Sequence, residues 1–149
     1  MEKLREGGFL ISKIKQVSGR IFDKMLKDNE ITDLNTAQGR IIFSLWQKDN
    51  VSIVELTRLT ALGKTTLTSM LERLEQIGYI VREPDKEDKR KIVVSLTKKS
   101  KKLRDKYEDV SRQMINLFYK GLSEEEIDVF EGTLNYILDN LNQYEEENR

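Results

Sequence analysis

Two short runs of β-branched residues, YIVRE at residues 79–83 and KIVVSL at residues 91–96, constrain the fold more than any other feature. They flank a polar loop that holds the only proline of the chain, which is the pattern of two strands joined in a hairpin. Elsewhere the apolar residues recur at steps of three and four positions, the spacing of an amphipathic helix. The chain is therefore expected to be mainly α-helical, and its 149 residues favour a single domain.

Capping and breaking residues divide the helical part into six segments. Ser52 begins a Ser-x-x-Glu capping box, and Ser123 begins a second one. Thr97 is a further N-cap candidate, and Gly78 suits the position just after a helix C-terminus. The expected helices cover about residues 8–28, 36–48, 52–60, 64–77, 97–121 and 123–143, and the last residues, YEEENR, are expected to be frayed and solvated.

The composition excludes several classes of function. The chain has no cysteine and no histidine, which removes disulfides, thiolate nucleophiles, Cys/His metal sites and the usual general base. No cofactor is therefore expected. The N-terminal run MEKLREGGFLISKIK is too charged for a signal peptide, and about 18 apolar residues never occur together. We expect a cytoplasmic protein without a membrane partner.

Charge is distributed unevenly, although the net charge of the chain is zero. Residues 82–104 hold ten Lys/Arg against four Asp/Glu, whereas residues 123–149 hold nine Asp/Glu against one arginine. The first segment therefore attracts phosphate and the second repels it.

Residues 52–97 follow the order of a winged helix-turn-helix: a short helix, a turn that contains Gly63, a second helix and a hairpin. The second helix of this motif enters the major groove of DNA. Its apolar arc centres on Leu67 and Leu71, so short hydroxyl side chains lie outward and permit close approach to base edges. The alternative is that these hydroxyls only cap and solvate a surface helix. The contacts predicted for this helix are Lys64, Thr65, Thr66, Thr68, Ser69 and Arg73.

Cationic residues crowd the loop of the hairpin, the wing of the motif. An arginine at such a tip can enter a narrow minor groove, where the electrostatic potential is strongly negative. Asp88 stands two residues before Arg90 and is placed to hold its guanidinium through two hydrogen bonds. The alternative is a solvated hairpin tip. The predicted wing contacts are Lys86, Asp88, Lys89, Arg90 and Lys91.

The run Gly63-Lys64-Thr65 is similar to the end of a phosphate-binding P-loop. That motif requires a glycine five positions before Gly63, where Arg58 stands, and a preceding strand, where a helix is expected. Nucleotide binding through this segment is therefore rejected.

The sequence, above all its helix-turn-helix and wing, resembles the MarR family of regulators over nearly the whole chain. The run Asp88-Lys89-Arg90-Lys91-Ile92-Val93-Val94-Ser95-Leu96-Thr97 looks like the family's Asp-x-Arg wing followed by Leu-Thr, and residues 62–68 and 71–78 look like its recognition helix. Many relatives carry arginine where Ser69 and Lys89 stand. By this resemblance Arg90 enters the minor groove with support from Asp88, and the hydroxyl residues meet the major groove.

The resemblance also implies a homodimer. Residues 33–97 would form the winged helix-turn-helix, and residues 1–30 and 98–149 would form N- and C-terminal dimerisation helices. A dimer presents two recognition helices to two half-sites about 34 Å apart. Relatives often bind a phenolic or otherwise amphipathic small molecule that changes this spacing. The predicted interface residues are Leu10, Ile14, Val17, Met114, Leu117, Leu134, Leu138 and Leu141.

The function predicted from the sequence is sequence-specific binding of double-stranded DNA by a ligand-responsive repressor. One rival is a winged helix that serves only as a protein-protein interaction module, with its basic wing against an acidic partner. Another is an enzyme built on lysine, serine and carboxylates, but no nucleophile, base and orienting group occur together.

Overall fold

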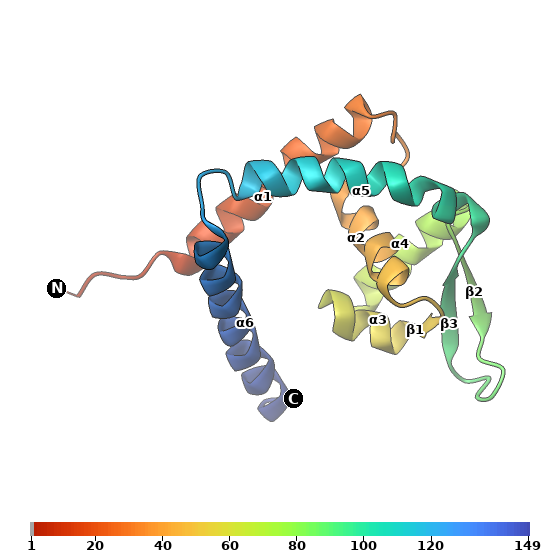
Figure 1. The fold of residues 1–149 in the computed structure, drawn as a ribbon. Coiled ribbons are helices and arrows are strands. Elements are labelled where there is room, and N and C mark those ends of the chain that lie inside the picture. Colours follow the sequence, from red (N-terminus) through yellow and green to blue (C-terminus); the bar gives the residue numbers. More distant parts are fainter. Residues whose placement is uncertain (1) are drawn as a thin grey trace. The chain divides into compact units, whose positions relative to one another are not determined.

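The computed structural model describes residues 2–149 (Figure 1). They form two compact units, one ending at Arg112 and the other spanning Gln113–Arg149. The first unit contains the helices that precede the hairpin, all of the strands and most of α5. The elements are α1 (Gly7–Asp28), α2 (Thr36–Gln47), β1 (Val51–Ser52), α3 (Ile53–Thr60), α4 (Lys64–Gln76), β2 (Ile80–Pro84), β3 (Ile92–Leu96), α5 (Lys98–Phe118) and α6 (Glu124–Glu147).

The core of the first unit lies where α2, α3, α4 and the sheet meet. Side chains that the helical periodicity placed on one face of each helix are buried there, with no exposed surface at Leu45, Leu56 or Leu71. Val94 on β3 closes the same core. Burial of a leucine of this kind contributes about 2 kcal/mol, so these positions hold the helix-turn-helix together.

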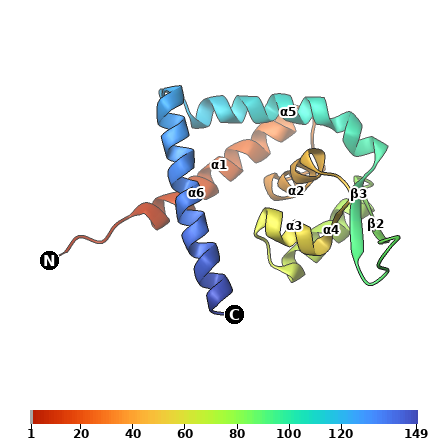
Figure 2. The same ribbon diagram turned by 60° about the horizontal axis from the view of Figure 1, so that its bottom comes forward.

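The strands form an antiparallel sheet of three strands in the order β1-β3-β2. The hairpin β2–β3 was predicted, and its register pairs Arg82 with Val94; both views show its loop projecting from the strands (Figures 1 and 2). The sequence did not predict β1, which is only two residues long and pairs Val51 with Val94. The wing is therefore anchored by a third strand that comes directly before α3.

Side-chain caps fix several helix ends. Asn35 caps α2, with a reciprocal bond from its own backbone N–H to the Gln38 side chain, a capping box that the sequence analysis missed. Thr97 caps α5 as predicted: its hydroxyl accepts the N–H of Ser100 at 3.4 Å and also donates to the carbonyl of Gly78 at 2.6 Å. Gly78 has the positive φ of 87° expected just after a helix.

An aromatic cluster joins α1, α2 and α5 within the first unit. The ring of Tyr107 meets the rings of Phe22 and Trp46 edge to face, at centroid distances of 5.7 and 5.2 Å. Burial raises the pKa of Tyr107 to about 12, so its hydroxyl stays protonated at neutral pH. Within residues 2–149 the buried indole N–H of Trp46 has no hydrogen-bond partner.

The second unit contains the end of α5 and all of α6. The ring of Phe118 packs against Tyr119 at 4.9 Å, and the hydroxyl of Tyr119 donates to Glu131 at 2.6 Å. Ser123 forms the complete capping box that the sequence predicted. The tail is solvated as expected, since residues 144–149 are all exposed, but the expectation that it is frayed was wrong: α6 continues through Glu147.

Across residues 2–149, no helix combines the length and the apolar character needed to span a membrane.

Candidate nucleic-acid interface

The turn between α3 and α4 sets the angle of the helix-turn-helix. Ala61 ends α3 in the left-handed conformation, with φ 59° and ψ 16°, a region that usually favours glycine. Gly63 follows in an extended conformation and acts as the N-cap of α4, where its carbonyl accepts the N–H of Leu67 at 2.9 Å. The predicted turn that contains Gly63 is therefore confirmed, since α3 ends at Thr60 and α4 begins at Lys64.

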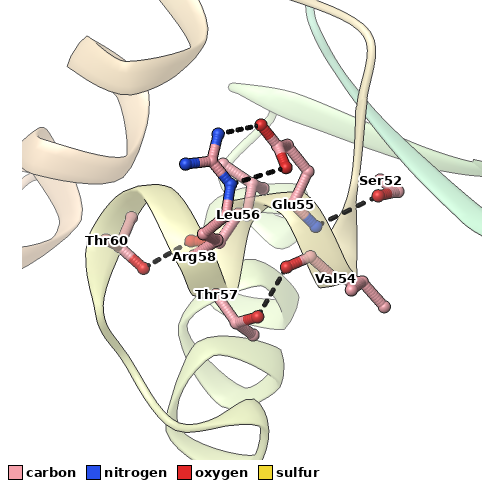
Figure 3. Close-up of polar contacts among 7 residues, drawn as sticks. All are labelled: Ser52, Val54, Glu55, Leu56, Thr57, Arg58 and Thr60. Carbon is pink, nitrogen blue, oxygen red and sulfur yellow. Dashed lines mark hydrogen bonds and ion pairs between the residues drawn. The ribbon is translucent and has the colours of Figure 1, made fainter. Parts of the chain in front are cut away.

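Figure 3 shows the polar contacts along α3 and at its N-cap, Ser52. The hydroxyl of Ser52 accepts the N–H of Glu55 at 3.1 Å, but the return bond of the predicted capping box is absent. The carboxylate of Glu55 instead accepts two hydrogen bonds from Arg58, at 3.0 and 2.5 Å, which lower the pKa of Glu55. The prediction of a full box at Ser52 was wrong because the arginine one turn later competes for the carboxylate.

The helix α4 has one buried and one exposed face, as predicted. Leu67, Leu71 and Leu74 are fully buried, whereas Thr65 and Ser69 are exposed on the outward face. A shallow open hollow of ≈ 370 Å³ lies along that face. It is lined by Lys64, Thr65, Thr68, Ser69 and Glu72.

The wing loop connects Pro84 to Ile92 and is closed by backbone hydrogen bonds, from Asp85 N–H to the Lys91 carbonyl at 2.8 Å and from Lys91 N–H to the Asp88 carbonyl at 3.0 Å. Asp88 accepts from Nε and Nη2 of Arg90 at 3.0 and 3.2 Å, which confirms the predicted support of the guanidinium. The Arg90 side chain remains 91% exposed. Hydrogen bonds from Arg90 lower the pKa of Asp88, so the support is ionised at neutral pH.

A contact between α4 and the wing was not predicted. Glu75, in the last turn of α4, accepts the backbone N–H of Arg82 and its guanidinium Nη2, each at 3.0 Å. Both side chains are partly buried, and the pair lowers the pKa of Glu75. Glu75 and Arg82 lie in different elements, one in a helix and one in a strand. Neither the helical nor the strand periodicity of the sequence therefore predicts their contact. The pair joins α4 to strand β2.

A second unpredicted cluster ties the end of α4 to the start of α5. The hydroxyl of Tyr79 donates to Asp33, with both carboxylate oxygens at 2.8 Å, and burial is the main reason that the pKa of Tyr79 is raised. Lys99 donates to the Ile77 carbonyl at 2.6 Å and lies 4.6 Å from the centroid of the Tyr79 ring. Arg82 and Lys99 both belong to the basic segment of residues 82–104. Their side chains bind groups of the protein itself.

The eleven residues predicted to contact DNA all belong to the first unit, and all are exposed except Thr68 and Asp88, which are half-buried. Those on α4 lie between Lys64 and Arg73, and those on the wing lie in the loop between the two strands. Their contact with DNA stays a prediction.

The predicted dimerisation residues fall in both units. Leu10, Ile14 and Val17 lie on α1 in the first unit, each at least 40% exposed. On the second unit Met114 and Leu134 are half-buried, and α6 has no buried residue at all. The other second-unit positions, Leu117, Leu138 and Leu141, are exposed at 45%, 46% and 62%.

Comparison with known proteins agrees with this geometry. A sequence model described as the MarR family matches residues 34–92. An organic hydroperoxide resistance transcriptional regulator of Bacillus subtilis is 30% identical over 99 residues, which are 66% of this chain and 66% of that relative. The chain thus aligns with about two thirds of the length of that relative.

Solved structures share the fold over most of the chain. A variant of MarR from E. coli in complex with operator DNA is similar with a TM-score of 0.78 and 26% identity, covering 88% of this chain and 92% of that one. BpsR of Bordetella bronchiseptica matches with a TM-score of 0.82 and 23% identity over 93% and 99% of the two chains, and supports the fold. The sequence match, the shared fold and the winged helix-turn-helix agree: the chain belongs to the MarR family of transcriptional regulators.

Proposed function

We propose that this chain binds specific sites on double-stranded DNA as a homodimer and acts as a ligand-responsive repressor in the cytoplasm, without carrying out chemistry of its own. The observation that carries the proposal is the pair Asp88–Arg90. Two hydrogen bonds hold an exposed guanidinium in one orientation at the tip of a hairpin. A solvated tip has no need for such support, whereas insertion into a narrow groove benefits from a side chain that is already ordered.

The exposed face of α4 supplies the second contact. Thr65 and Ser69 have short side chains, so the helix can approach the floor of the major groove closely. The free backbone N–H groups at the start of α4 favour a phosphate, and Lys64 adds a positive charge there. In this proposal α4 reads the major groove while Arg90 enters the adjoining minor groove.

The exposed apolar residues of α1 and α6 support a homodimer. An α-helix such as α6, which buries none of its residues within the described chain but exposes Leu138 and Leu141, needs a partner to remove that surface from water. A second copy supplies an identical apolar face, as in most symmetric oligomers. Two recognition helices would then meet two half-sites about one turn of DNA apart, roughly 34 Å.

An organic effector is part of the proposal. The BpsR structure concerns regulation of DNA binding in that protein by 6-hydroxynicotinic acid. The present chain has no cysteine or histidine, so a thiol or an imidazole cannot be its sensing group. A phenolic or amphipathic molecule that binds better to a conformation unable to fit DNA would release the operator by population shift.

The salt dependence of DNA binding separates this proposal from a protein-interaction module. The full chain is incubated with genomic fragments, bound fragments are selected, and the affinity for one of them is measured over a series of salt concentrations. Contact with six or more phosphates predicts that log K falls steeply with log salt, with a slope of about −5 or steeper. Binding that shows no sequence preference and no such slope would contradict the proposal.

The homodimer is tested by placing a charge in the apolar face. Replacing Leu117 or Leu138 with glutamate should convert the dimer to a monomer in sedimentation experiments and weaken binding to a duplex with two half-sites. Asn140→Glu adds the same charge at an exposed polar position of α6 and should remain dimeric. A Leu138→Glu variant that sediments as a dimer would show that the interface lies elsewhere.

A further inference from the structure

One acidic residue, Glu72, lies among the hydroxyl residues of the outward face of α4. Positions 65, 69, 72 and 76 follow the spacing of one helical face, and all four are exposed. Glu72 also lines the hollow formed with Lys64 and Thr65. A carboxylate therefore stands on the face of α4 that is proposed to enter the major groove.

The Glu72 carboxylate has no partner within the protein. Over residues 2–149 it takes part in neither a hydrogen bond nor an ion pair, although Arg73 is its neighbour in the sequence. The other acidic residue of α4, Glu75, accepts a hydrogen bond from Arg82 at each of its two carboxylate oxygens. Within the described residues the carboxylate of Glu72 thus has no competing partner, whereas that of Glu75 is already paired.

The position of Glu72 on α4 decides which group of the DNA can donate a hydrogen bond to its carboxylate. Phosphates are negatively charged and repel it, so proximity to the backbone of the duplex would weaken binding. Glu72 is the ninth of the thirteen residues of α4, beyond the first turn where the helix N–H groups favour phosphate. A side chain of its length, flanked by short hydroxyl residues, reaches farther from the helix than Thr65 or Ser69 does.

Base edges offer two amino groups in the major groove. An ionised carboxylate only accepts hydrogen bonds. Adenine presents its N6 amino group beside the N7 acceptor, which repels a carboxylate, whereas cytosine presents the N4 amino group as its only polar atom there. The chemistry of Glu72 therefore fits cytosine better than any other base.

We propose that Glu72 is a specificity-determining residue that accepts a hydrogen bond from the N4 amino group of one cytosine in each half-site. This inference rests on the proposed function and names a feature of the DNA sequence that the site recognises. A mismatched base pair typically changes affinity by about 1–3 kcal/mol, so the cytosine should be preferred by roughly fivefold to a hundredfold at that position.

The test selects duplexes from a randomised library with the full-length chain and with two variants. Wild type should favour cytosine at one position of each half-site, and Glu72→Ala should reduce that preference to within about twofold while leaving the other positions unchanged. Glu72→Gln should move the preference toward adenine, because an amide can donate to N7 and accept from N6. Glu125→Gln, which removes an exposed charge from α6, should select the wild-type sequences.

The outcomes separate this inference from the function on which it rests. If wild type selects a defined sequence and Glu72→Ala selects the same sequence with the same preferences, Glu72 does not read a base and the inference is overturned. If wild type selects nothing above background, the proposed function itself fails before the variants are compared. Circular dichroism of each variant checks that an exposed substitution has left the fold intact.

Discussion

The ring of Tyr107 on α5 occupies the space that a side chain would need at Gly39 on α2. Ring atoms Cε2 and Cζ lie 2.8 and 2.9 Å from the ideal Cβ position, and the hydroxyl of Tyr107 is closer still. Tyr107 is buried and holds the rings of Phe22 and Trp46, so it has little room to move. The absence of a side chain at Gly39 is a requirement of the aromatic cluster.

Gly39→Ala should therefore destabilise the chain, although alanine is the better helix former. Overpacking of a buried contact costs about 1–3 kcal/mol, which exceeds the gain of about 1 kcal/mol in helix propensity. Gly19→Ala on α1 is the matched control, because nothing lies within 4 Å of a Cβ there, and it should be neutral or stabilising. Urea unfolding measures both, and an equally stable Gly39→Ala variant would contradict the packing argument.

Arg90→Ala should weaken DNA binding about tenfold or more and leave the melting temperature nearly unchanged, because the side chain is 91% exposed and, within residues 2–149, its hydrogen bonds and ion pair go to Asp88. Asp88→Asn should cause a smaller loss, since it keeps the arginine but weakens the bonds that orient it. Fluorescence anisotropy with the selected duplex measures both effects, with Lys24→Ala on α1 as a control for the loss of one exposed charge. If Arg90→Ala binds DNA with wild-type affinity, the wing arginine does not contribute to binding.

The pair Glu75–Arg82 should show a measurable coupling in a double-mutant cycle. Glu75→Gln, Arg82→Gln and the double variant should give a coupling of about 0.5–1 kcal/mol at neutral pH, the range for partly exposed pairs. The pKa of Glu75 is lowered in the folded chain, so the stabilisation is fully present above its ordinary value of 4.5 and is lost as the pH falls through the lower folded-state value. A coupling that is equally large in strong acid would show that the carboxylate charge is not its source.

Ala61→Gly should stabilise the chain, by up to about 1 kcal/mol. The left-handed conformation at φ 59° costs alanine about 1–2 kcal/mol, and part of this is offset by the greater freedom of glycine in the unfolded chain. Ala37→Gly, an exposed position in α2, is the same substitution in an ordinary helical conformation and should destabilise by up to about 1 kcal/mol. Thermal unfolding of the two variants should therefore shift in opposite directions.

Local patterns predicted the helices, the hairpin and the support of Arg90 correctly, because each depends on residues within a few positions of one another. The pattern at Ser52 was misleading, since Glu55 had a stronger local partner in Arg58. The strand β1 escaped notice because a two-residue strand shows no alternation. Local sequence patterns therefore predicted the helices and the hairpin, but they did not predict which of two possible partners a side chain would bind.

Contacts between distant segments were out of reach of sequence reasoning. Asp33 and Tyr79 are 46 positions apart, and α2, α3 and α4 lie between them in the sequence. Counting charges along the chain also overstated the cationic surface, since Arg82 is ion-paired with Glu75 and Lys99 with Asp33. Neither the pairing nor the loss of free charge follows from periodicity or composition.

The turn after α2 is joined to the last residue of the wing by a hydrogen bond from Leu96 to Asp49. One oxygen of Asp49 accepts the N–H groups of both Asn50 and Leu96 at 2.9 Å, so the end of α2 and the last residue of β3 are fastened at a single atom. A displacement of β3 is thereby coupled to the end of α2, the helix that carries Trp46. Because Trp46 is the only tryptophan of the chain and is buried in the aromatic cluster, we expect its fluorescence to report a displacement of the wing that reaches α2.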